Sequence, residues 1–354
     1  MNVERKFFYR LCGYLFTALL VLFLFIFQGK RIEEKPYYER EISFPVMGTI
    51  AHLKIQGERG MAPEELHKVL SAMQQEIRDL ENECNMYNPQ SPVSRLNKSA
   101  HSAPFAPSDR LWFLLERSRQ FYDFSDGSFD ITIPPLMRVW GFHKKRDSLP
   151  GKKEIKEAKK FVGLAKISFD DDKRVVSFPA PGFQLDLGGI AKGFALDLAR
   201  KKAEDMGVFR GVLDLGGNIL TLSRPYYGKT CYKIGIRDPR KKGEILTVIE
   251  MPPGMSIATS GSYERFRQIR GKKVSHIIDP LSGYPVAHSL SATILTEKGI
   301  DSDALSTILF IKGESFMEKI VKKFPRTRIL YFREDEEGKM KGFASGKAFR
   351  NVVK

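Results

Sequence analysis

The chain has 354 residues, of which 42% are hydrophobic and 28% are charged, so disordered, collagen-like and low-complexity classes are excluded for its bulk. Three cysteines are too few for a disulfide-stapled miniprotein. A formal net charge of +16 means that nucleic acid, anionic lipid and phosphate-bearing ligands must all be considered as partners.

The N-terminal segment has the pattern of a membrane anchor. Residues 11–29 contain no charged side chain, and as a helix they would span roughly 28 Å, close to the thickness of a bilayer's hydrocarbon core. Basic residues precede the apolar run, which favours a cytoplasmic N-terminus. Cleavage is the rival interpretation, but the sequence after Phe27 is a poor cleavage site. We expect residues 1–29 to be a single-pass signal anchor in the inner (cytoplasmic) membrane, with the rest of the chain on the extracytoplasmic side.

After a charged tether at residues 30–40, one domain is expected over residues 41–354. Hydrophobic periodicity and turn residues predict helices and strands that alternate in no regular βαβ order. This favours an α+β domain built on a mixed sheet over a doubly wound parallel sheet. The predicted helices are 63–80, 110–122, 152–161 (closed by Gly163), 191–206, 302–311 and 315–324, and the predicted strands are 49–55, 167–169, 174–178, 219–222, 233–237, 246–251 and 328–332.

Several common sites are absent from the sequence. It contains no G-x-x-x-x-G-K-[ST] P-loop, no G-x-G-x-x-G after a strand, and no C-x-x-C or H-x-x-x-H zinc pattern. Its basic runs are not interleaved with aromatic residues, so nucleic acid is not an expected partner. Cys84 and Cys231 could form a disulfide, and the sequence leaves that question open.

A glycine turn before a predicted helix is the most informative segment. In Q-L-D-L-G-G-I-A-K-G-F-A-L-D, at residues 184–197, an apolar strand is predicted to end at Asp186. Two glycines allow a tight turn, and the free N–H groups of the helix that follows can face an anion. Lys192 lies in the first helical turns, where its ammonium can reach a phosphate. A plain strand–helix turn with an exposed lysine explains the same pattern equally well.

Two further segments contain polar side chains suited to chemistry. His276 precedes an Asp-Pro turn on a predicted strand, where a histidine is more often a hydrogen-bonded structural residue than a catalyst. Asp303 and Thr307 are four residues apart on a predicted helix, so their oxygens share a face and suit Mg²⁺. The alternative is that Asp301 or Ser302 is simply the N-cap of that helix.

These segments together resemble the ApbE-type flavin transferases, which are FAD:protein FMN transferases. The resemblance covers roughly residues 44–311 and rests on the order and spacing of many short strings. The strings are M-G-T at 47–49, S-R-L-N at 94–97, S-F-D at 128–130, D-L-G-G-I-A-K-G at 186–193, D-L-G-G-N at 214–218, I-R-D-P at 236–239, T-S-G-S-Y-E-R at 259–265, H-I-I-D-P at 276–280 and D-A-L-S-T at 303–307.

The resemblance implies Mg²⁺-dependent transfer of FMN from FAD to a Thr or Ser hydroxyl of an acceptor protein, through a phosphoester bond and with release of AMP. It implies an acceptor that is a subunit of a redox complex. It also implies a ligand set for Mg²⁺, made of the Gly189 carbonyl, Asp303 and Thr307. The residues that the resemblance places against FAD are Met47, Tyr87, Ser128, Phe129, Asp130, Asp186, Lys192, His276 and Ile277.

This chemistry needs a base to take the proton of the acceptor hydroxyl. His276 is our first choice because its ordinary pKa suits neutral pH. Asp303 is the rival, although metal binding would lower its basicity. Three other functions stay open: an FAD pyrophosphatase that uses water in place of the acceptor, a non-catalytic FAD-binding or delivery protein, and a basic membrane-associated scaffold.

Overall fold

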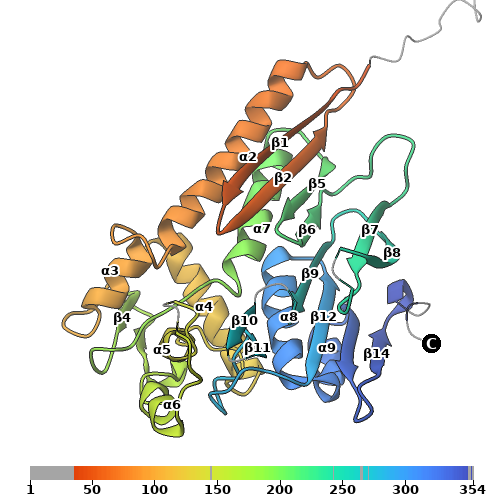
Figure 1. Cartoon of the computed structure of the whole chain (residues 1–354). Coiled ribbons are helices and arrows are strands. Elements are labelled where there is room, and N and C mark those ends of the chain that lie inside the picture. The colour runs from red at the N-terminus through yellow and green to blue at the C-terminus, as the bar shows by residue number, and fades with distance from the viewer. Residues whose placement is uncertain are drawn as a thin grey trace, which may run out of the picture. The chain divides into compact units, whose positions relative to one another are not determined.

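The fold is that of a computed structural model, which describes residues 36–143, 146–241, 243–263, 266–269, 271–349 and 352 (Figure 1). The predicted anchor at residues 1–29 and most of the tether lie outside these residues. The first strand begins at Glu39, inside the segment predicted as tether. Within the described ranges, no helix is long and apolar enough to cross a membrane.

An antiparallel sheet forms the centre of the domain. In the part of the chain that is described, it has eight strands in the order β1-β2-β5-β6-β9-β12-β13-β14, and every neighbouring pair is antiparallel. The α+β class is therefore confirmed, whereas the expectation of a mixed sheet was wrong. The strands are β1 (Glu39–Val46), β2 (Thr49–Gln56), β5 (Arg210–Leu215), β6 (Asn218–Thr221), β9 (Ser256–Gly261), β12 (Ser289–Thr296), β13 (Arg328–Glu334) and β14 (Met340–Ser345).

Helices cover one face of this sheet (Figure 1). Helix α2 packs on α7, α7 packs on α8, and α8 packs on β9 and β12. The predicted apolar stripe of α2 is buried throughout, and the helix runs on to Cys84. The helices are α2 (Pro63–Cys84), α3 (Pro92–Ser99), α4 (Asp109–Phe124), α5 (Pro134–Val139), α6 (Lys152–Lys159), α7 (Ala191–Asp205), α8 (Gly299–Lys312) and α9 (Met317–Lys323), with short 3₁₀ turns η1 (Leu164–Lys166), η2 (Glu314–Phe316) and η3 (Lys347–Phe349).

Two smaller hydrophobic clusters complete the domain. One joins the hairpin of β7 (Tyr232–Arg237) and β8 (Ile245–Met251) to residues of β12, β13 and η3. The other joins α5 and α6 to the hairpin of β10 (Phe266–Ile269) and β11 (Lys272–Ser275). There the Trp140 indole N–H donates to the Gly283 carbonyl at 2.9 Å. A short hairpin of β3 (Ser168–Asp170) and β4 (Val175–Ser177) matches the predicted one.

Three local expectations were wrong. The segment before the glycine turn is irregular rather than a strand ending at Asp186, and α6 ends at Lys159 rather than near Gly163. His276 is the first residue after β11 rather than part of it. Cys84 and Cys231 are both free thiols, which answers the question that the sequence left open.

Candidate active site

Two glycines set the distance between helices α7 and α8. A Cβ atom on Gly193 would lie 2.0 Å from the Gly299 carbonyl oxygen, and one on Gly299 would lie 2.2 Å from the Gly193 carbonyl oxygen. Real side chains do not approach backbone this closely, so the crossing requires glycine on both helices. This contact brings the first turn of α7 against the first two turns of α8.

Asp303 of α8 is held by the first turn of α7. Its Oδ2 accepts the Gly193 N–H at 2.9 Å, and its Oδ1 lies 3.5 Å from the Lys192 ammonium. The Asp303 side chain is only 6% exposed, and that of Lys192 is 25% exposed. A buried carboxylate is stable only when donors or cations surround it, and here a helix N-terminus and a lysine supply both.

Asp197 makes the reciprocal contact from α7 to α8. Its two carboxylate oxygens accept the N–H groups of Gly299 at 2.8 Å and Ile300 at 2.9 Å. Burial raises the pKa of Asp197, while these two N–H donors act to lower it. The residue at the N-cap position is Lys298, so the proposal that Asp301 or Ser302 caps this helix was wrong. Asp301 instead pairs with Arg117 at 2.5 Å.

We expect Asp197→Ala to lower the free energy of unfolding by about 1–2 kcal/mol, the usual cost of losing a helix cap. Urea denaturation measures this loss. The matched control is Asp205→Ala in the same helix, which removes only an exposed pair with Lys201 and should cost less than about 0.5 kcal/mol. Equal losses in the two variants would contradict the capping role.

Thr307 lies one helical turn beyond Asp303, beside the glycine turn. The position of a Cβ on Gly189 is 3.8 Å from Thr307 Oγ1 and 3.4 Å from the ring of Phe129. Thr307 Oγ1 is also 3.4 Å from the Ser260 hydroxyl. Thr307, the Gly189 backbone and Phe129 therefore meet at one place, next to the Asp303–Lys192 pair.

The segment around Asp130 is fixed by its own hydrogen bonds. Asp130 Oδ1 accepts from the Thr132 N–H at 2.8 Å and the Thr132 hydroxyl at 2.6 Å, and Oδ2 accepts the Leu164 N–H at 3.2 Å. Burial raises the pKa of Asp130 and these hydrogen bonds oppose the rise. Ser128 and Phe129 are buried beside it. Asp130 therefore fixes the conformation of the loop that carries Ser128 and Phe129.

Asp186 and Met47 are held by backbone hydrogen bonds. Asp186 Oδ1 accepts the Gly188 N–H at 2.8 Å, and its own N–H donates to the Ile131 carbonyl at 2.8 Å. Met47 has a left-handed backbone with φ of 50° between β1 and β2, and its N–H donates to Glu81 Oε1 at 2.5 Å. Asp186 and Met47 are therefore each held in a turn with a defined conformation.

The structure places some of the predicted residues close together, and others lie elsewhere. Lys192, Asp303, Thr307, Gly189 and Phe129 form one connected group. Tyr87 is 69% exposed on the loop after α2. His276 is partly buried after β11, and Ile277 is buried in the main core with its N–H donating to Ser275 Oγ at 3.2 Å.

A family model described as the ApbE family matches residues 47–331. This chain belongs to the ApbE family. It is similar to the FAD:protein FMN transferases of Haemophilus influenzae, 29% identical over 324 residues (88% of this chain and 91% of the relative), and Treponema pallidum, 29% identical over 324 residues (87% of each). Among solved structures, it is similar to the ApbE protein of Thermotoga maritima, with a TM-score of 0.77, 29% identity and coverage of 90% of this chain and 100% of the other. The flavin transferase ApbE of Vibrio cholerae gives a TM-score of 0.77 at 25% identity, with 88% and 98% covered.

Sequence reasoning missed the residues that hold this ApbE site together. Gly193 and Asp197 both lie in the quoted glycine-turn segment, but neither was given a role there. A glycine inside a predicted helix was a usable signal, because it is unfavourable unless close packing requires it. Glu81, which holds Met47, is one of many acidic residues on α2 and had no distinguishing signal.

The donor set fits a Mg²⁺ ion. Among the described residues, no three His, Cys, Asp or Glu side chains converge. The predicted ligands include one carboxylate, one hydroxyl and one backbone carbonyl, all hard oxygens of the kind that Mg²⁺ prefers. Asp303 and Thr307 share a face of α8, and Thr307 lies beside Gly189, so these three residues are the ones that would hold the ion.

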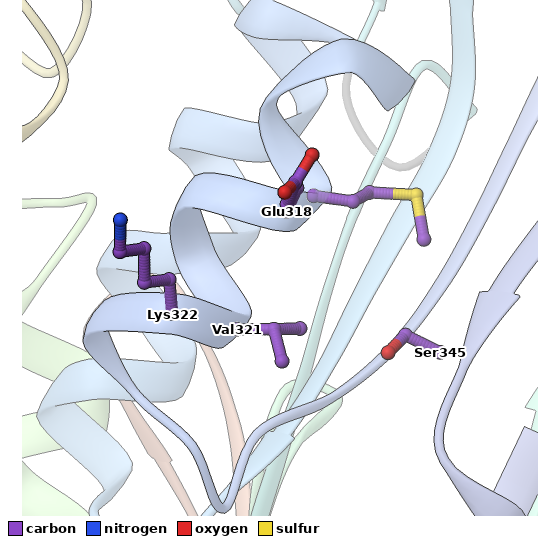
Figure 2. A pocket seen from close by; sticks show the side chains of 5 residues that line it. Glu318, Val321, Lys322 and Ser345 are labelled. Carbon is purple, nitrogen blue, oxygen red and sulfur yellow. The ribbon is translucent and has the colours of Figure 1, made fainter.

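A hollow between α9 and β14 is separate from these residues (Figure 2). It has a volume of about 520 Å³ and is lined by Met317, Glu318, Val321, Lys322 and Ser345. No predicted site residue lines it. Its lining of two apolar side chains, one carboxylate, one ammonium and one hydroxyl brings no catalytic constellation with it.

Proposed function

We propose that this chain transfers FMN from FAD to a Thr or Ser hydroxyl of an acceptor protein and releases AMP. Its family and its relatives make it a flavin transferase of the FAD:protein FMN transferase type. The observation that carries the finer proposal is that Asp303 binds the N-terminus of α7 and Lys192, with Thr307 one turn further along the same face of α8. An oxygen-rich face beside a cation, at the positive end of a helix, suits a pyrophosphate and a divalent ion.

In the proposed reaction, the acceptor oxygen attacks the phosphorus on the FMN side of the FAD pyrophosphate. A P–O bond to the acceptor forms, and the bond to the bridging oxygen breaks. AMP leaves with that oxygen and its electron pair. Lys192 counters the negative charge that grows on the leaving phosphate, which is the main requirement of phosphoryl transfer. A Mg²⁺ ion held by Asp303, Thr307 and the Gly189 carbonyl would supply further charge neutralisation.

His276 is proposed to take the proton of the acceptor hydroxyl. What favours it over Asp303 is that the Asp303 carboxylate already accepts the Gly193 N–H and pairs with Lys192. Both oxygens of the Asp303 carboxylate are therefore engaged by groups of this chain. His276 lies beside Ile277, which the family resemblance places at the flavin end.

We expect His276→Ala to slow FMN transfer by about 10²–10⁴-fold, the usual contribution of a general base, while FAD affinity changes less than about threefold. The pair of measurements is a single-turnover transfer rate and a flavin fluorescence titration. His288→Ala, an exposed histidine of the same chain, is the control and should match the wild type. An unchanged transfer rate in His276→Ala would remove the base assignment.

The transferase and pyrophosphatase reactions differ only in the nucleophile, so product analysis separates them. The full-length chain in detergent is incubated with FAD and Mg²⁺, with and without a candidate acceptor, and FMN and AMP are quantified. A transferase releases AMP in step with acceptor modification and leaves little free FMN. Equal amounts of FMN and AMP, independent of acceptor, would identify a pyrophosphatase instead. Bound and unchanged FAD would identify a delivery protein.

The proposed setting is the outer side of the inner membrane. The apolar, uncharged stretch of residues 11–29 supports a single-pass anchor, and the basic residues before it support this orientation. An acceptor that is a subunit of a membrane redox complex would meet the enzyme there.

A further inference from the structure

The imidazole of His143 contains a buried polar atom, the Nε2 nitrogen. His143 follows the Trp140–Phe142 segment at the end of α5, and among the described residues its Nε2 is buried without a hydrogen-bond partner. Buried polar atoms without partners destabilise a folded chain, so they are rare unless a ligand or a function requires them.

His143 contacts one residue that the family resemblance assigns to FAD and is influenced by the charge of another. The ring of Tyr87 lies edge-on to the imidazole, with 5.6 Å between the ring centroids, and Tyr87 is 69% exposed. Burial lowers the pKa of His143 below its ordinary value of 6.5, while the negative charge of Asp186 acts in the opposite direction. Burial thus favours the neutral form of the imidazole. His143 is in ring contact with Tyr87, and the charge of Asp186 acts on its imidazole.

We propose that His143 is a further binding residue for FAD, whose Nε2 forms a hydrogen bond with a polar group of the bound dinucleotide. Tyr87 is the exposed neighbour of the imidazole, so a ligand that binds against Tyr87 lies next to His143. The neutral imidazole offers a donor or an acceptor according to its tautomer. Binding would then satisfy an atom that is unsatisfied in the ligand-free chain. This inference rests on the proposed function, because it takes FAD as the ligand.

The test uses His143→Phe, which keeps a flat ring against Tyr87 but removes the nitrogen. The full-length chain is studied in detergent with EDTA and without acceptor, so that FAD is not consumed. We expect FAD affinity to fall about tenfold, as for loss of a hydrogen bond in a binding site. We also expect the ligand-free melting temperature to stay the same or rise by about 2–4 °C, since an unsatisfied atom is removed. If His143 had only a structural role, its replacement would not lower FAD affinity without also lowering the melting temperature.

His67→Phe, at an exposed position of α2, is the control and should leave both quantities unchanged. If His143→Phe does not fold, His143→Gln replaces it, because the glutamine amide can reach the same position; it should keep FAD affinity within about threefold. FAD affinity within twofold of wild type in His143→Phe would overturn the proposal, as would a tenfold loss in His143→Gln. Failure of the wild-type chain to bind FAD would count against the proposed function itself.

Discussion

Asp303→Ala is expected to lower the rate of FMN transfer by about 10³-fold or more. One reason is electrostatic, because the carboxylate is the one acidic side chain in the proposed metal ligand set, and loss of a group that stabilises the transition state typically costs 10²–10³. The other reason is structural, because Asp303 Oδ2 holds the N–H of Gly193 at 2.9 Å. The measurement is the transfer rate at saturating FAD and Mg²⁺.

Asp303→Asn separates these two reasons. The amide keeps an oxygen that can accept the Gly193 N–H but loses the negative charge. We expect Asn to restore the stability lost in Asp303→Ala and to leave transfer slow. Transfer close to wild type in Asp303→Asn would contradict the role of the charge, and normal transfer in both variants would remove Asp303 from the active site.

Gly193→Ala is expected to cost at least about 3 kcal/mol of stability, at or above the upper end of the usual range for overpacked cores. The added Cβ would lie 2.0 Å from the Gly299 carbonyl oxygen and 2.8 Å from Asp303 Cβ. The first of these atoms is backbone, so relief requires the two helices to move apart. That movement would also lengthen the Gly193–Asp303 hydrogen bond. Urea denaturation measures the stability, and an FAD titration measures the effect on the site.

Gly189→Ala is the matched control for this prediction. A Cβ there would have its nearest contacts at 3.4 Å from Phe129 and 3.8 Å from Thr307, which are ordinary van der Waals distances. We expect a change in stability below about 1 kcal/mol. Similar losses in Gly189→Ala and Gly193→Ala would mean that the close helix crossing is not what makes Gly193 necessary.

The sequence predicted several amphipathic elements, because one face of each meets the core and the other meets solvent. The stripe from Leu66 to Leu80 and the predicted strand at residues 49–55 are examples, and both are confirmed. Strands β9 and β12 escaped prediction because they lie in the middle of the sheet. Nearly all of their residues are buried, so they lack the alternation that identifies a half-exposed strand. The start of α8 was placed late because its cap, Asp197, comes from another helix.

The candidate site was predictable residue by residue but not as an arrangement. Local strings pointed to Lys192, Asp303 and Thr307, and the structure places these three around the α7–α8 crossing. The crossing itself depends on a contact between Gly193 and Gly299, which are far apart in the sequence. The unsatisfied nitrogen of His143 likewise follows from packing, which no local pattern records.

The central claim is that FMN becomes covalently attached to an acceptor, and intact-mass spectrometry of the acceptor tests it most directly. The full-length chain in detergent is incubated with FAD, Mg²⁺ and an extracytoplasmic redox subunit with an exposed threonine. The account predicts a mass gain equal to that of one FMN less one water, absent with EDTA and absent with Asp303→Ala. An unmodified acceptor together with complete conversion of FAD to free FMN and AMP would contradict it.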